Sequence, residues 1–109
     1  MPFDQILAKR IRDELTSISG LEEKKMFGGV GFLIRGNMAC GVHKEDLIVR
    51  VGPAGYAEAL AQSHARPFDM TGRPMAGWIM VSPGGFAADD DFKRWIKQGV
   101  EFAQTLPVK

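Results

Sequence analysis

The chain has 109 residues, of which 45% are hydrophobic and 25% charged, and its formal net charge at pH 7 is +1. These values are typical of one globular domain, residues 1–109, and they exclude a disordered chain and a strongly basic duplex-DNA binder. The single cysteine, Cys40, excludes an intrachain disulfide. No apolar run approaches the ~18 residues of a membrane span, and no apolar signal segment opens the chain, so we expect a cytoplasmic protein without membrane contact.

The first half of the chain predicts a helix followed by an antiparallel sheet. Apolar residues recur every four positions from Phe3 to Leu15, which is typical of an amphipathic helix over residues 3–18 that ends at Ser19-Gly20. Strands are predicted at 21–26, 30–35, 37–43 and 46–51. Gly36-Asn37 is expected to form the turn of the second hairpin, and Lys44-Glu45 the turn of the third.

The predicted turns set the register of these strands. If Arg35 lies opposite Met38, one sheet face is almost wholly apolar and should be the core. This predicted core face contains Gly31, Leu33, Met38, Cys40, Val42, Leu47, Val49 and Val51. The opposite, mixed face contains Val30, Phe32, Ile34, Ala39, Gly41, His43, Asp46, Ile48 and Arg50. Because this second face is half apolar, it should be covered by helices or offered to a partner.

The second half of the chain predicts a short helix, one strand and a long helix. Gly52-Pro53 introduces a helix over 54–62, residues 65–72 form a loop or short extended piece, and a strand covers 75–81 before Ser82-Pro83-Gly84-Gly85. An apolar stripe from Phe92 to Ala103 predicts the last helix. The expected fold class is α+β: an antiparallel meander sheet packed by N-terminal and C-terminal amphipathic helices plus one short helix.

Three glycines, Gly28, Gly29 and Gly31, form the most unusual cluster of the chain. They are a candidate anion-binding turn. Ile34 occupies the position where a dinucleotide-binding fingerprint needs its third glycine, and a strand follows where that fingerprint needs a helix. A bulge or a tight strand entry is therefore the favoured interpretation.

The remaining polar residues predict no catalytic, cofactor or metal site. Cys40 and His43 are three apart in a strand and so point to opposite faces, and the carboxylates of Asp89, Asp90 and Asp91 splay around a helix end. Nucleic-acid binding would need basic and aromatic side chains to share a surface. The candidates for that alternative are Lys24, Lys25, Phe27, Phe32, Arg35, Arg50, Arg66, Arg73 and Trp78.

Several segments resemble the N-terminal domain of the TfoX/Sxy competence-regulator family. They are Lys25-Met26-Phe27-Gly28-Gly29, Gly36-Asn37-Met38-Ala39-Cys40-Gly41-Val42, Leu47-Ile48-Val49-Arg50-Val51 and Arg66-Pro67-Phe68-Asp69-Met70-Thr71-Gly72-Arg73-Pro74-Met75-Ala76-Gly77-Trp78. The resemblance covers nearly the whole chain and implies an α+β domain with an antiparallel sheet. In larger bacterial members it implies regulation of natural competence through transcriptional coactivation and protein contacts. Those members carry a second, helical domain, which we do not expect in this chain, and the resemblance brings no catalytic residues.

The sequence therefore predicts a non-enzymatic regulatory or protein-interaction domain. We expect it to bind another protein or to self-associate as a dimer through the mixed face. The predicted contact residues are Phe32, Ile34, Ile48, Arg50 and Trp78. Nucleic-acid binding and anion binding at Gly28–Gly31 are the alternatives.

Overall fold

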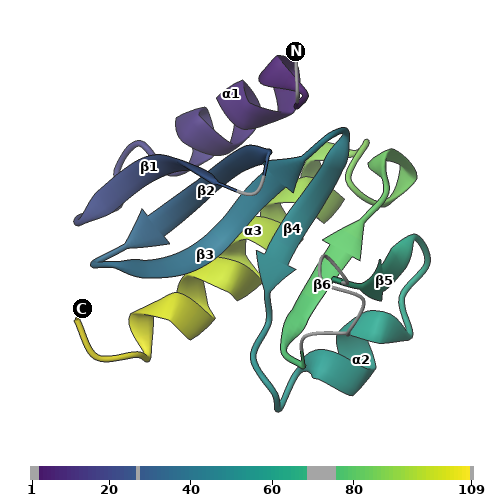
Figure 1. Cartoon of the computed structure of the whole chain (residues 1–109). Helices are drawn as coiled ribbons and strands as arrows, with labels where there is room; N and C mark the ends of the chain where they lie inside the picture. Colours follow the sequence, from purple (N-terminus) through teal and green to yellow (C-terminus); the bar gives the residue numbers. More distant parts are fainter. Residues whose placement is uncertain (1–2, 27, 69–75, 109) are drawn as a thin grey trace.

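The computed structural model describes residues 3–26, 28–68 and 76–108 (Figure 1). Its elements follow in this order: α1 (Gln5–Glu14), β1 (Leu21–Met26), β2 (Gly29–Ile34), β3 (Asn37–His43), β4 (Asp46–Arg50), α2 (Tyr56–Leu60), β5 (Ala65–Pro67), β6 (Trp78–Val81), a short 3-10 turn (Pro83–Gly85) and α3 (Asp89–Gln104). The strands form one antiparallel sheet in the order β1-β2-β3-β4-β6-β5. The predicted α+β class and meander are confirmed, and the segment 65–72, predicted as a loop or short extended piece, begins with the short edge strand β5.

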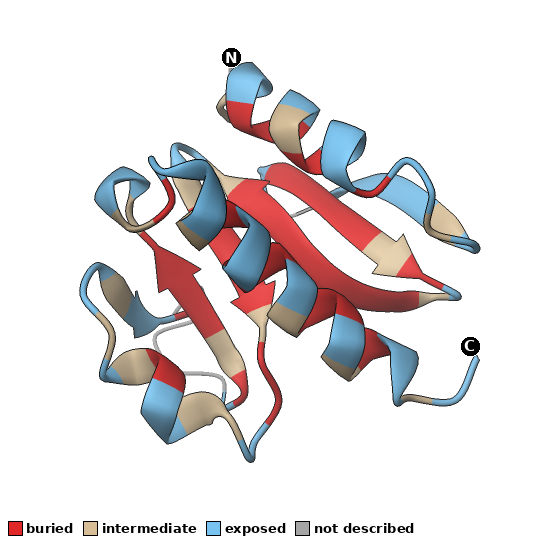
Figure 2. Ribbon diagram, turned by 180° about the vertical axis from the view of Figure 1, so that it is seen from behind, coloured by how far each residue is buried: buried red, intermediate tan, exposed pale blue. Residues whose placement is uncertain are grey.

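The molecule has two layers, with α1 and α3 against one face of the sheet (Figures 1 and 2). Asp4 starts α1 because its carboxylate accepts hydrogen bonds from the backbone N–H groups of Ile6 and Leu7. Leu7 and Ile11 then point into the core, where α3 contributes Trp95. The amphipathic stripes read from the sequence therefore face the sheet, as predicted.

The hairpin between β2 and β3 turns one residue earlier than predicted. Ile34 lies opposite Asn37, so the turn residues are Arg35 and Gly36, whose φ angles are 53° and 86°. The predicted turn at Gly36-Asn37 is wrong. Asn37 is instead buried, and its side-chain amide donates to the carbonyl of Pro107 at 2.8 Å.

The earlier turn reverses the faces of β2. Phe32 lies opposite Cys40 and faces the helices, and a bulge between Phe32 and Leu33 changes the register toward the turn. Phe32 is 0% exposed and Ile34 is 1% exposed. Their predicted place on the second face is therefore wrong, since a one-residue slip moves every side chain of a strand to the other face.

The faces assigned to several other side chains of β2 and β3 also change with the corrected turn. Val30 belongs to the core, whereas Leu33 and Met38, predicted in the core, lie on the opposite face. Cys40 and Val42 pack in the core as predicted, and so do the β4 residues with which they pair.

The face of the sheet away from α1 and α3 carries a second apolar cluster, which we call the outer cluster. It consists of the buried residues Met38, Ile48, Phe68 and Met80 and the half-buried Leu33 and Trp78. Phe68 follows β5 and packs back onto the sheet, so a connecting segment covers part of this face.

Candidate functional site

Trp78 lies at the accessible border of the outer cluster. It begins β6 and lies opposite Arg50 of β4. The Arg50 guanidinium carbon lies 5.0 Å from the centre of the Trp78 ring and 5.4 Å from that of Phe102, while the Phe68 ring centre lies 6.1 Å from Trp78. Cation–π attraction holds the Arg50 guanidinium against these rings, so the side chains form a contact surface that is ordered before a partner binds.

Burial lowers the pKa of Arg50 below its ordinary value. The guanidinium still carries its charge at neutral pH. Trp78 is half-buried, so part of the ring is already fixed by Phe68 while the remainder is accessible. Tryptophan and arginine side chains that are ordered before binding lose little conformational entropy when a partner covers them.

The five predicted contact residues do not form one surface. Phe32 and Ile34 are in the core, and Ile48 is in the outer cluster but is 0% exposed. Arg50 and Trp78 remain as the accessible members of the predicted set. The structure adds Leu33 to this surface. Had the alternating residues Val30, Phe32 and Ile34 been taken as the core face of β2, Leu33 would have been predicted on the outer face.

The basic residues proposed for nucleic-acid binding are dispersed over the described part of the chain. Lys24 lies opposite Gly31 on the outer face, whereas Lys25 lies opposite Val30 on the helix side. Arg66 pairs with Asp46 at 2.6 Å and also donates to the Ser82 hydroxyl. Phe27 and Arg73, which that hypothesis also needs, lie outside the described residues.

The glycine cluster has a structural explanation. Gly28 has φ +74°, and a Cβ atom at Gly29 would collide with the carbonyl oxygen of Val42. Gly29 and Gly31 are both buried within β2, where their backbone belongs to the sheet ladder. The positive φ of Gly28 and the close approach of β2 to β3 at Gly29 each favour a residue without a side chain, which is a structural reason for two of the three glycines.

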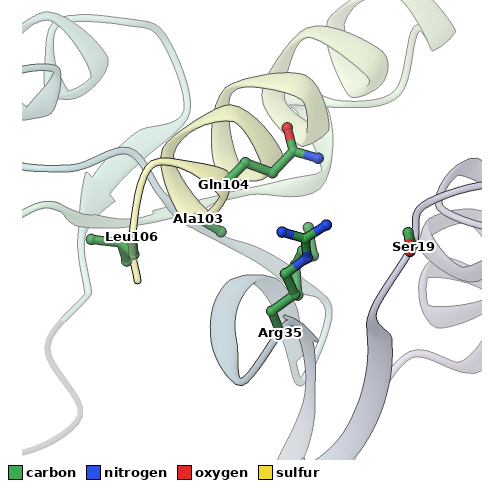
Figure 3. A pocket seen from close by; sticks show the side chains of 6 residues that line it. Ser19, Arg35, Ala103, Gln104 and Leu106 are labelled. Atoms are coloured by element: carbon green, nitrogen blue, oxygen red, sulfur yellow. The ribbon is translucent and has the colours of Figure 1, made fainter. Parts of the chain in front are cut away.

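A pocket of about 170 Å³ lies where the β2–β3 turn meets the end of α3. Ile34, Ala103 and Leu106 form its apolar wall, and Figure 3 shows Arg35 directed toward the gap between Gln104 and Ser19. The last turn of α3 has no basic residue of its own. Arg35 lines the pocket at this end of α3, where a cation is favourable beside the negative end of the helix dipole.

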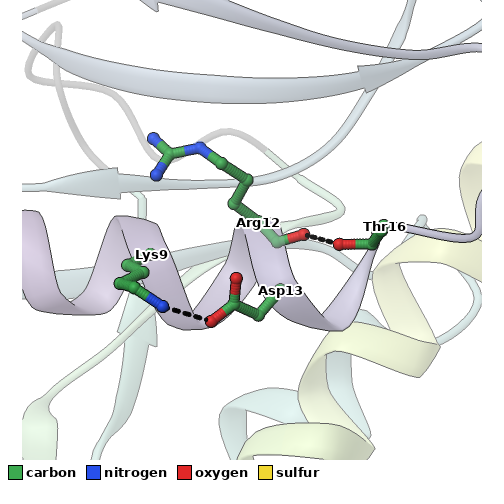
Figure 4. Close-up of polar contacts among 4 residues, drawn as sticks. All are labelled: Lys9, Arg12, Asp13 and Thr16. Atoms are coloured by element: carbon green, nitrogen blue, oxygen red, sulfur yellow. Dashed lines mark hydrogen bonds and ion pairs between the residues drawn. The ribbon is translucent and has the colours of Figure 1, made fainter.

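The exposed side of α1 is a solvated helix surface (Figure 4). Lys9 pairs with Asp13 at 2.8 Å, and the Thr16 hydroxyl donates to the carbonyl of Arg12 at 3.0 Å. Both contacts are local and exposed, so they support the helix rather than a site.

Two of the three aspartates at the start of α3 have basic partners. Asp89 pairs with Arg10 and Asp91 with Arg94. Burial raises the pKa of the Cys40 thiol to about 12, which makes it unreactive at neutral pH. Within the described residues, no group of three or more His, Cys, Asp or Glu side chains is arranged to hold a metal ion, and no helix has the length and apolar character to cross a membrane.

Comparison with known proteins gives one assignment. No curated protein matches the chain. The family model described as the TfoX N-terminal domain matches residues 13–103, which include β1 through β6 and nearly all of α3. The match covers most of the chain, and the chain therefore belongs to the TfoX N-terminal domain family.

Proposed function

We propose that this domain is a non-enzymatic regulatory module of the cytoplasm that binds another protein through the accessible border of its outer cluster. The observation that carries the proposal is the half-buried Trp78 ring, held between the Arg50 guanidinium and Phe68. Tryptophan and arginine are the residues most enriched at the energetic centres of protein interfaces. The family assignment agrees with a regulatory role, because its larger members are expected to act through protein contacts.

The surroundings of Trp78 fit a small protein interface. Leu33 is half-buried in the same cluster and extends the apolar surface, while the Arg66–Asp46 pair lies on the neighbouring strands as a polar rim. An apolar centre with a charged rim is the usual composition of such a contact.

Site-specific photo-crosslinking in cells tests this proposal. A photoreactive amino acid at position 78 should give adducts with a protein partner, and substituting Arg50→Ala in the same chain should weaken them. The matched control places the same group at Ile6, which is 76% exposed and lies on α1. Equal adducts from both positions would show adventitious contact, and adducts that nuclease removes would favour the nucleic-acid alternative.

A further inference from the structure

The two edges of the sheet are built differently. β5 has three residues and ends in Pro67, so it offers little backbone for pairing with another strand. β1 has six residues and contains no proline, and among the residues that the structure describes it pairs with β2 alone. Figure 1 shows β1 at the border of the sheet. The long edge is therefore the one able to accept another strand.

The backbone groups that face this edge follow from the ladder. The N–H of Arg35 donates to the carbonyl of Gly20 at 2.9 Å. In an antiparallel pair hydrogen-bonded residues alternate, so Glu22 and Lys24 direct their backbone groups toward β2. The backbone groups of Leu21, Glu23 and Lys25 point away from the sheet.

The side chains of β1 alternate between the two faces. Glu22 and Lys24 lie opposite Leu33 and Gly31 on the outer face. Glu23 lies opposite Phe32 on the helix side. The charged residues at 22 to 25 are all exposed, in the order Glu-Glu-Lys-Lys.

We infer that β1 is a self-association edge, at which two copies of the chain pair antiparallel around a two-fold axis at Glu23 and join their sheets. The axis is perpendicular to the sheet, so each face of one copy continues into the same face of the other. Glu22 then lies opposite Lys24 of the second copy, and the axis repeats this ion pair. Opposite charges directly across an antiparallel pair are favourable.

The like charges that meet at the axis are also compensated. Glu23 meets Glu23 of the second copy, but each carboxylate already accepts two hydrogen bonds from its own Arg12, both at 2.8 Å. The neighbouring register would form two Glu23–Lys25 ion pairs but would place Lys24 against Lys24 at the axis. Among the described residues no carboxylate pairs with Lys24, so that register leaves two like charges uncompensated.

Charged side chains usually protect a sheet edge from pairing. The order in β1 repels its own copy when Glu22 or Lys25 lies at the axis, whereas an axis at Glu23 or at Lys24 forms two ion pairs. Of these two registers, the one at Glu23 is favoured because its like charges at the axis are already paired within their own chains. This surface is distinct from the border at Trp78, so self-pairing leaves the proposed partner surface accessible and goes beyond it.

Charge reversal tests the inference through the oligomeric state. Light scattering across a concentration series should show a monomer–dimer equilibrium that weakens as salt screens the exposed pairs. Glu22→Lys or Lys24→Glu alone should raise the dissociation constant by about tenfold or more, because each turns both ion pairs into repulsions. An equimolar mixture of the two variants should restore dimers, since a lysine of one variant then faces a glutamate of the other at both cross-strand positions.

The control is Asp13→Lys on α1, which changes an exposed charge away from this edge and should leave the equilibrium unchanged. A wild-type chain that stays monomeric at millimolar concentration would overturn the inference. So would a dimer that neither reversal weakens, or a mixture that stays monomeric.

Cysteine crosslinking measures the register independently. Glu23→Cys should form an intermolecular disulfide under mild oxidation, because the two Cα atoms at the axis are expected about 5.5 Å apart. Cys40 does not compete because it is buried. Lys24→Cys serves as the comparison, and its faster self-crosslinking would overturn the axis at Glu23.

Discussion

At the residue scale, the Arg12–Glu23 pair links α1 to β1 with a measurable dependence on pH. The hydrogen bond from Arg12 is the main reason that the pKa of Glu23 lies below its ordinary value of 4.5. A carboxylate with a lowered pKa in the folded state adds stability above its unfolded pKa and loses it as pH falls through the folded value. The pair should thus stabilise the fold at pH 7 and cease to do so in acid.

We expect Glu23→Gln to lower the free energy of unfolding at pH 7 by about 0.5 kcal/mol, the size typical of an accessible ion pair. The difference from wild type should shrink as pH falls below 4.5 and through the lowered pKa. Urea unfolding at several pH values and low protein concentration measures it. A difference that stays constant with pH would show that the variant changes packing rather than the ion pair.

At the scale of the elements, α3 packs unusually close to β3 at Gly99. A Cβ atom there would collide with the carbonyl oxygen of Ala39, which is backbone and has little freedom to move. In an open helix, Gly→Ala stabilises by about 1 kcal/mol. Overpacking a core costs about 1–3 kcal/mol, so the steric effect should outweigh the helix propensity.

Gly99→Ala should therefore lower the urea midpoint of unfolding without changing the denaturant dependence. Lys97→Ala, exposed on the same helix, is the matched control and should be nearly neutral. An alanine variant at 99 as stable as wild type would mean that α3 moves away from β3 at no cost.

The sequence predicted most elements because their signals are local. The stripe of α3, the charged β1 and the apolar β3 and β4 were all recognisable. The turn between β2 and β3 was not, since local chemistry favours Gly36-Asn37 over an arginine at φ 53°. Asn37 is used instead in a tertiary hydrogen bond with Pro107, which no local rule detects.

For the same reason, only part of the candidate site could be predicted from the sequence. Arg50 and Trp78 lie in the strands predicted at 46–51 and 75–81, which the structure forms over Asp46–Arg50 and Trp78–Val81. Leu33 was lost with the register of β2. Phe68 lies in a segment interpreted as a loop or short extended piece, and its place in one cluster with Ile48 is a tertiary arrangement of distant parts of the chain.

At the scale of the whole molecule, the helices bury one face of the sheet and the outer cluster partly buries the other. Substitutions on the two faces should differ sharply in their effect. Phe32 is 0% exposed against the helices, whereas Trp78 is half-buried on the outer face. Removing a large apolar side chain from a core lowers the free energy of unfolding by about 3–5 kcal/mol. The whole free energy of unfolding of a typical domain is about 5–15 kcal/mol.

Phe32→Glu should therefore unfold the protein, because it removes this packing and also buries a charge without a partner. Trp78→Glu should remain folded with a modest loss of stability. Far-UV circular dichroism with thermal unfolding distinguishes the two. A Phe32→Glu variant that unfolds cooperatively near the wild-type temperature would mean that residue 32 faces solvent. That outcome requires β2 to slip by one residue, which would restore the turn at Gly36-Asn37 and reassign every side chain of the strand.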